Sequence, residues 1–183
     1  QGGVPDVKEA ARKITTRTRA IVLVSPNNPT GAIYPPETIR QFFDLAQAHG
    51  IALVLDETYK DFLPTDDAPH GLLREPGWPE TLIQLFSFSK VYAITGHRVG
   101  GLVAGPEISA EIAKAMDCAA ICAPAIGQAA ALFALQNLDL WKQEKRRLSL
   151  ARLDALRQAM ARNDLAYEVV SAGAFFAYMR HPH

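Results

Sequence analysis

The chain has 183 residues, 49% of them hydrophobic and 21% charged, which fits one large globular domain or one domain with part of a second. Its 19 basic and 19 acidic residues balance, so composition gives no electrostatic basis for binding nucleic acid or an anionic membrane. No apolar run approaches the ~18 residues that span a bilayer and no signal peptide is recognisable, so we expect a cytoplasmic protein.

The first hundred residues alternate between helical and strand patterns. Helical spacing predicts helices over residues 5–15 and 35–50. Continuous apolar runs, the first of them typical of a strand buried on both faces, predict strands over residues 19–25, 51–59, 81–90 and 98–105. A long proline-rich connection, residues 61–80, precedes the third strand.

This alternation predicts the α/β class, with a mostly parallel sheet covered by helices on both faces. The link from Lys90 to the fourth strand is short and lacks an obvious crossover helix. Since parallel strands need a long crossover, we expect the fourth strand to run antiparallel to the others.

From about residue 107 the pattern becomes mainly helical. Helices are predicted over residues 107–123, 125–138 and 138–163, and residues 167–180 read as two strands around a glycine-containing break. We expect the long last helix to bridge two domains, with residues 1–145 in the first and residues 146–183 forming the bridge and the beginning of a second.

Cys118 and Cys122 lie four residues apart in the first of these helices. We favour small, reduced core residues over a disulfide, since two thiols in a cytosolic protein are commonly of this kind. Two thiols supply only half of a tetrahedral zinc site, so no metal site is expected.

Polar residues of several chemical kinds follow the predicted strands. They are Asn28, then Asp56 and Tyr59, then Ser87, Ser89 and Lys90, and finally Arg98. Each has an ordinary explanation taken alone, as a turn residue, a cap or a solvated charge. Ligands of open α/β sheets bind outside the carboxyl ends of the strands, so the joint occurrence favours a single site there.

The segments that carry these residues resemble the signature segments of a known enzyme family. NNPTG, LDETY and SFSK followed by GHRVGG are similar, in order and spacing from about residue 18 to 106, to class I and II aminotransferases, the fold-type I enzymes that depend on pyridoxal 5'-phosphate (PLP). The resemblance implies an aspartate aminotransferase-like large domain followed by the start of an α+β small domain.

The resemblance also implies roles for the residues at the strand ends. Lys90 would form the Schiff base with PLP and then act as general base and acid, with Asp56 holding the ring nitrogen protonated. Tyr59 and Asn28 would hydrogen-bond the phenolic oxygen of the ring and lower the pKa of the Schiff base. The phosphate would be bound by a guanidinium and two hydroxyl groups, those of Arg98, Ser87 and Ser89.

The expected function is therefore a PLP-dependent aminotransferase that moves an amino group between an L-amino acid and a 2-oxo acid. A PLP lyase of the same fold, such as a carbon–sulfur lyase, shares these residues, and an aminotransferase-like ligand-sensing domain of a transcription regulator is a third reading. The family pattern places a phosphate loop, a ring-stacking aromatic residue and a substrate-carboxylate arginine outside these residues. We therefore expect part of an enzyme roughly twice as long, with weak or absent transamination if the chain ends here, that is a homodimer when complete.

Overall fold

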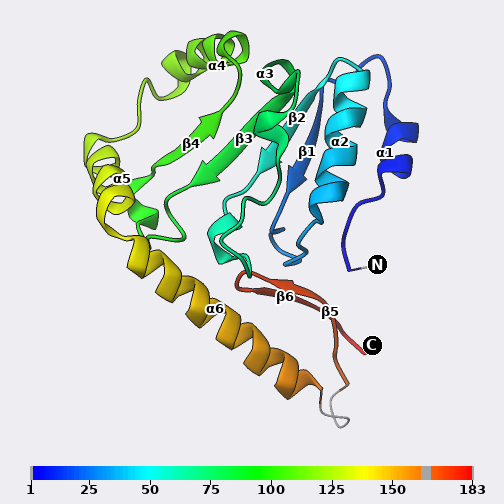
Figure 1. Ribbon diagram of the computed structural model, residues 1–183, viewed down its shortest axis with the longest axis vertical. Helices are drawn as coiled ribbons and strands as arrows, with labels where there is room; N and C mark the ends of the chain where they lie inside the picture. Colours follow the sequence, from blue (N-terminus) through cyan, green and yellow to red (C-terminus); the bar gives the residue numbers. More distant parts are fainter. Residues whose placement is uncertain (1, 162–165, 183) are drawn as a thin grey trace.

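The computed structural model describes residues 2–161 and 166–182, and its first half is built on a four-stranded sheet (Figure 1). In spatial order, the strands are β1 (Ala20–Val24), β2 (Ala52–Asp56), β3 (Leu82–Ser87) and β4 (Gly100–Val103). β1, β2 and β3 are parallel, whereas β4 pairs antiparallel with β3. The expected α/β class and the reversed fourth strand are both confirmed.

Strand register explains why the carboxyl ends of the parallel strands share one edge. Asp56 at the end of β2 pairs with Val24 at the end of β1 and lies opposite Leu85 of β3. The β3–β4 connection contains only one short 3₁₀ helix, η3 (Thr95–His97). Parallel strands are usually joined by a crossover α-helix, which this connection lacks, and β4 returns antiparallel beside β3.

Helix α2 (Pro36–Ala48) provides most of the core against the sheet. Its buried side chains are Ile39, Phe42, Phe43 and Ala46, which pack with Leu23, Leu53, Leu55 and Leu82 of the strands. Burying each large apolar side chain contributes about 1.5–3 kcal/mol. The short helix α1 (Val7–Lys13), capped by Asp6, adds partly buried residues to the same core.

β1 does not have the two-sided burial that its apolar sequence predicts. Leu23 is 5% exposed, but Val22, which points to the opposite face, is 64% exposed. Successive strand residues alternate between faces, and β1 is the edge strand of the described sheet. No helix within residues 2–161 and 166–182 covers the Val22 side chain, so only one face of this strand is buried.

The connection between β2 and β3 contains three one-turn helices that the sequence pattern does not predict. They are η1 (Lys60–Phe62), η2 (Leu72–Arg74) and α3 (Trp78–Thr81). A single turn is too short to show helical periodicity. Gly77, at φ 78°, precedes α3, and this left-handed conformation is one that glycine adopts at no steric cost.

The C-terminal half consists of three helices and a hairpin. The helices are α4 (Pro106–Ala119), α5 (Ala125–Asn137) and α6 (Asp139–Met160), and the antiparallel hairpin is β5 (Glu168–Gly173) with β6 (Phe176–Arg180). α6 runs from α5 to the hairpin (Figure 1). Residues 162 and 163 of the predicted helix lie outside the described residues. The domain boundary near residue 145 stays a prediction.

Two further observations concern the surface. Cys118 and Cys122 are exposed, so their predicted core position is wrong. Helix α4, which carries Cys118, contributes no buried residue because it packs only at the margin of the fold.

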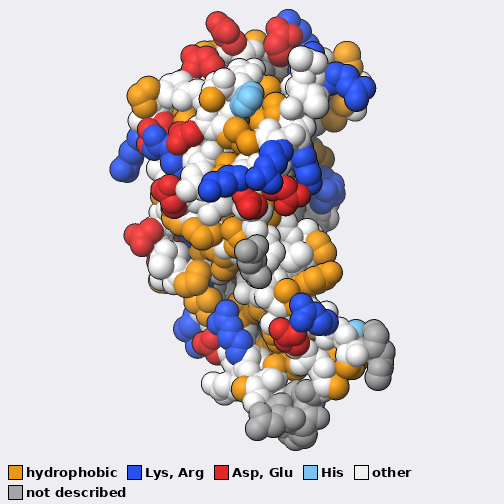
Figure 2. All heavy atoms as spheres, turned by 90° about the vertical axis from the view of Figure 1, so that its right-hand side faces the viewer, with side chains coloured by type: hydrophobic (Ala, Val, Ile, Leu, Met, Phe, Trp, Pro, Cys, Tyr) orange, Lys and Arg blue, Asp and Glu red, His pale blue; other side chains and the backbone are white. Residues whose placement is uncertain are grey.

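Figure 2 shows the face carrying α1 and α2, where basic and acidic side chains lie together, as in the pairs Lys13–Glu9 and Arg40–Asp44. Within the described residues, no helix is long and apolar enough to cross a membrane.

Candidate active site

The polar residues that the sequence singles out lie at the edge where β1, β2 and β3 end. Asn28 follows β1, Asp56 is the last residue of β2, and Ser87 is the last residue of β3. The strand register places these three ends side by side. The residues therefore come together because the strands are parallel and the chain turns after each one.

Asn28 and Tyr59 contact each other directly. The Asn28 amide Nδ2 donates a hydrogen bond to the Tyr59 hydroxyl, at 3.2 Å. Tyr59 is 6% exposed, and its ring makes edge-to-face contacts with Phe175 and Phe176, with ring centroids 5.3 and 5.0 Å away. The phenol is thus held on one side by an amide and on the other by the β5–β6 hairpin.

Asp56 has a fixed orientation at the end of β2. Its Oδ1 accepts a hydrogen bond from the backbone N–H of Thr58 at 2.9 Å, and the residue is half-buried. Among the described residues, its second carboxylate oxygen makes no hydrogen bond. The carboxylate is therefore oriented by its own turn and keeps acceptor capacity for a ligand.

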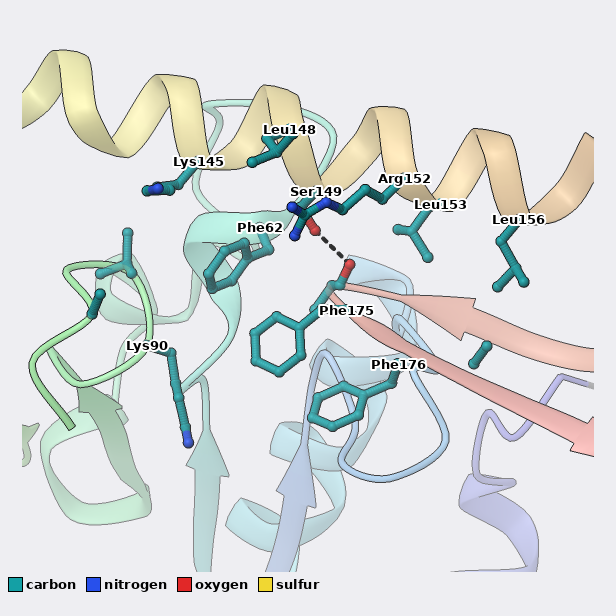
Figure 3. A pocket seen from close by; sticks show the side chains of 14 residues that line it. Phe62, Lys90, Lys145, Leu148, Ser149, Arg152, Leu153, Leu156, Phe175 and Phe176 are labelled. Atoms are coloured by element: carbon teal, nitrogen blue, oxygen red, sulfur yellow. Dashed lines mark hydrogen bonds between the residues drawn. The ribbon is translucent and has the colours of Figure 1, made fainter.

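Ser87, Ser89 and Lys90 form a tight turn after β3. The Ser89 N–H donates to Ser87 Oγ at 3.1 Å, and Ser89 is 6% exposed. Lys90 is exposed and lines a cavity of about 540 Å³, shared with Phe62, Phe175 and Phe176 and with one face of α6. Figure 3 shows its side chain extending away from α6.

Arg98 lies at the same edge, but among the described residues it makes no hydrogen bond to Ser87 or Ser89. Ser87 pairs with Gly100 in the β3–β4 register, so Arg98 lies beside the turn that carries Lys90. Its Nη1 donates to the carbonyl of Thr95 at 2.7 Å, and its φ of 52° is left-handed. The described contacts thus support the position of Arg98 and leave its role as an anion ligand a prediction.

Glu57, His70 and Gln84 form a buried polar cluster that the sequence does not indicate. Glu57 is 1% exposed; its Oε2 accepts from Gln84 Nε2 and its Oε1 lies 3.3 Å from His70 Nε2. His70 Nδ1 accepts from the Leu72 N–H at 3.1 Å. The ring proton is therefore assigned to Nε2, facing the carboxylate. The only sequence signal is a second acid directly after Asp56.

The aromatic contacts to Tyr59 are also missing from the sequence prediction. Phe175 and Phe176 follow Gly173 and Ala174 in the hairpin turn, more than a hundred residues after Tyr59. Two adjacent phenylalanines in a short hairpin are a weak signal, because a strand normally directs neighbouring side chains to opposite faces. Here both rings reach the same tyrosine.

Comparisons with known proteins agree with this architecture. The family model described as aminotransferase class I and II matches residues 2–183. A probable aspartate/prephenate aminotransferase of Thermus aquaticus is 34% identical over 98% of this chain and 46% of its own length. The alanine aminotransferase of Mycobacterium tuberculosis H37Rv is 43% identical over 58% of this chain and 25% of its own length.

Solved structures show the same fold. An aspartate aminotransferase from Thermus thermophilus with maleate superimposes with a TM-score of 0.83 at 34% identity, covering 97% of this chain and 46% of that one. An N-succinyldiaminopimelate aminotransferase from Mycobacterium tuberculosis gives a TM-score of 0.80 at 28% identity, over 96% and 44%. The chain therefore spans about half the length of the proteins it matches.

Proposed function

Because the chain belongs to the class I and II aminotransferase family, we propose that it is the part of a PLP-dependent aminotransferase that carries the reactive lysine, Lys90. The proposed reaction moves an amino group between an L-amino acid and a 2-oxo acid. The observation that supports this proposal is the edge of the sheet where the parallel strands end. The carboxylate of Asp56, the Asn28–Tyr59 pair and Lys90 all follow or end strands at this edge.

The residues at this edge fit the chemistry of PLP. Asp56 offers a carboxylate for a protonated ring nitrogen, and the Asn28–Tyr59 pair offers hydrogen-bond donors for an oxygen on the ring. Two hydroxyl groups and a guanidinium, those of Ser87, Ser89 and Arg98, are the donor types that bind phosphate. When bound, PLP supplies an electron-accepting ring that stabilises negative charge at the α-carbon of an amino acid.

Lys90 has two tasks in this proposal. Its primary amine would hold the cofactor, since amines and aldehydes condense with loss of water. The same amine, once free, would move a proton at the α-carbon of the substrate. The exposed, extended side chain next to the cavity gives the amine the freedom that both tasks require.

Asp56 and the Asn28–Tyr59 pair act on the charge of the ring. A carboxylate beside a ring nitrogen favours its protonated form, because opposite charges in contact stabilise the ionised state. The phenol of Tyr59 and the amide of Asn28 would stabilise negative charge on a ring oxygen of the cofactor by hydrogen bonding to it. The Thr58 hydrogen bond and the Phe175 and Phe176 rings keep these groups in place.

We extend the proposal to the partners of the intact protein. Substrates are small amino and 2-oxo acids, and the different substrates named for the similar proteins leave the particular amino acid open. A homodimer is supported by α5, whose outer side chains Ile126, Leu132 and Phe133 are 70%, 56% and 59% exposed. A helix that is apolar on all sides is normally covered. No observation favours the lyase or the regulator reading.

The experiment that tests this function is cofactor attachment to Lys90 in the intact polypeptide. Incubation with PLP followed by borohydride reduction and peptide mass spectrometry should place the reduced cofactor on the peptide containing Lys90, and Lys90→Ala should lose it. Lys145→Ala is the matched control, since Lys145 lines the same cavity. Attachment at Lys145, or undiminished attachment in Lys90→Ala, would overturn the proposal.

A further inference from the structure

The loop after β1 and the β5–β6 hairpin touch through two glycines. A Cβ atom added to Gly31 would lie 2.6 Å from the Gly173 nitrogen and 2.9 Å from the Phe176 carbonyl oxygen, and one added to Gly173 would overlap the carbonyl oxygen of Gly31. Contacts this short between a Cβ and backbone atoms do not occur in folded proteins. The two backbones can therefore approach this closely only because both residues are glycine.

A hydrogen-bond chain continues from this contact into the loop. Ser171 Oγ donates to the Thr30 carbonyl at 2.6 Å, and Thr30 Oγ1 donates to Asn27 Oδ1 at 2.8 Å. The loop is closed on itself by the Gly31 N–H, which donates to the Asn27 carbonyl at 2.7 Å. The hairpin thus holds the loop at Thr30 and Gly31, on the C-terminal side of Asn28, and hydrogen bonds within the loop reach back from these residues to Asn27.

The same hairpin also holds the residue to which Asn28 is bonded. Phe175 and Phe176 lie edge-to-face against the Tyr59 ring. The turn that carries them is fixed to α6, because Ser149 Oγ donates to the Ala174 carbonyl at 2.6 Å (Figure 3). One element therefore contacts both Tyr59 and the loop that carries Asn28, although it lies more than a hundred residues further along the chain.

We propose that the β5–β6 hairpin positions the Asn28–Tyr59 pair, with Gly173 and Ser171 as the positioning residues that set how close the amide and the phenol stand. The inference rests on the proposed function and deepens it, because that pair serves the ring oxygen of the cofactor. Displacing the hairpin weakens the support of both partners at once. The pair would then stabilise negative charge on the ring oxygen of bound PLP less well, and the absorbance of PLP held at Lys90 would titrate at a higher pH.

The test is Gly173→Ala in the intact polypeptide, with two measurements. Without cofactor, hydrogen–deuterium exchange of the loop amides near Asn28 should accelerate by about tenfold, since exchange reports local opening. With PLP bound, the pH at which the visible absorbance changes should rise by about one unit, the size of a moderate pKa perturbation. Gly71→Ala is the matched control, because a Cβ at Gly71 has no atom within 4 Å.

The outcomes separate the inference from the proposed function. Unchanged loop exchange together with an unchanged absorbance titration in folded Gly173→Ala overturns the inference. A wild-type protein with no Lys90-dependent absorbance overturns the function, while the exchange measurement still decides whether the hairpin positions the loop. If Gly173→Ala does not fold, Ser171→Ala removes only the hydrogen bond to Thr30. It should shift both readouts in the same direction, and the absence of any shift overturns the inference.

Discussion

Asp56 and Glu57 are neighbouring acids with opposite surroundings. Asp56 is half-buried at the edge of the sheet and bonded to its own turn, whereas Glu57 is 1% exposed and faces Gln84 and His70. Adjacent residues near a strand end point to opposite sides, so the Asp56 carboxylate stays partly exposed where β2 ends and the Glu57 carboxylate faces the interior. The polar cluster beneath Glu57 anchors the end of β2 from inside.

Removing the buried carboxylate should be costly to folding. Glu57→Ala leaves the buried Gln84 amide without its acceptor, so we expect the free energy of unfolding to fall by about 1–3 kcal/mol. Chemical denaturation of the intact protein measures it. Glu57→Gln keeps one acceptor oxygen and the side-chain volume, so its free energy of unfolding should fall less. A fall below about 1 kcal/mol in Glu57→Ala would contradict a structural role for this carboxylate.

The Tyr59 hydroxyl should matter for activity more than other buried phenols. Tyr59→Phe removes the group that accepts from Asn28, and one hydrogen bond to a developing charge corresponds to about 10- to 100-fold in kcat/KM. Steady-state transamination assays check this. Tyr92→Phe is the control, as Tyr92 is 8% exposed in the same buried cluster; an equal loss there would point to packing alone.

At the residue scale, the sequence predicts single positions better than contacts. Asn28, Asp56 and Lys90 lie where the strand pattern and the motifs put them, because strand ends are determined locally. The buried Glu57 cluster and the aromatic contacts to Tyr59 depend on segments distant in sequence, which no local pattern reveals. The roles of all these residues stay proposals.

At the element scale, α6 is fastened to the long β2–β3 connection by charge. Arg146 of α6 pairs with Asp66 and also donates from Nε to the Asp61 carbonyl at 3.3 Å. The hydrogen bond from Arg146, with its positive charge and that of Lys142, lowers the pKa of Asp66 below its ordinary value of 3.8. This irregular connection is thereby held against the helix that leads to the hairpin.

That pKa shift predicts an acid-dependent contribution to stability. Because the folded-state pKa of Asp66 lies below the unfolded value of 3.8, the contribution is complete above this pH and is lost as the pH falls through the folded-state pKa. Asp66→Asn should therefore flatten the pH dependence of unfolding below about pH 4 and lower stability slightly at pH 7. Denaturant unfolding at a series of pH values measures the free energy of unfolding of both proteins. In Asp67→Asn, which removes no ion pair among the described residues, an equal change would contradict the assignment.

Long elements follow from sequence, and short ones do not. α2, α5 and α6 begin and end within a few residues of their predicted limits, because each has several turns of periodic apolar residues or clear end signals. The one-turn helices between β2 and β3 and the exposed position of α4 were not predictable. Their conformations are set by neighbours in space, and the cysteines of α4 were misplaced for the same reason.

At the scale of the whole molecule, the outer face of α5 should be an interface between two copies. It presents Ile126, Leu132 and Phe133 to solvent and has no charged residue. Phe133→Glu in the intact polypeptide should shift sedimentation toward the monomer, because burying an unpaired carboxylate in an apolar interface is unfavourable. Lys114→Glu on the exposed surface of α4 is the control. If Phe133→Glu dimerises as strongly as the wild-type protein, the outer face of α5 is not the dimer interface.

The fold class was predictable from sequence because alternating strands and helices leave few topologies. A mostly parallel sheet with one returning strand is a simple arrangement for this order of elements, and the chain superimposes on a solved aminotransferase structure with a TM-score of 0.83. The uncovered side of β1 was not predictable, since the apolar pattern of Val22 and its neighbours indicates two-sided burial whether or not the covering segment is present.

The spatial order of the sheet is also its order along the chain, β1 to β4. During synthesis, a chain that emerges from its N-terminal side can therefore add each new strand to one already made, and domains commonly fold in that direction. Asn28 is made first, then Asp56 and Tyr59, then the turn with Lys90, and after them Arg98 and the hairpin that contacts Tyr59. The edge is thus laid down in chain order, and the element that holds Tyr59 and the loop with Asn28 is added last.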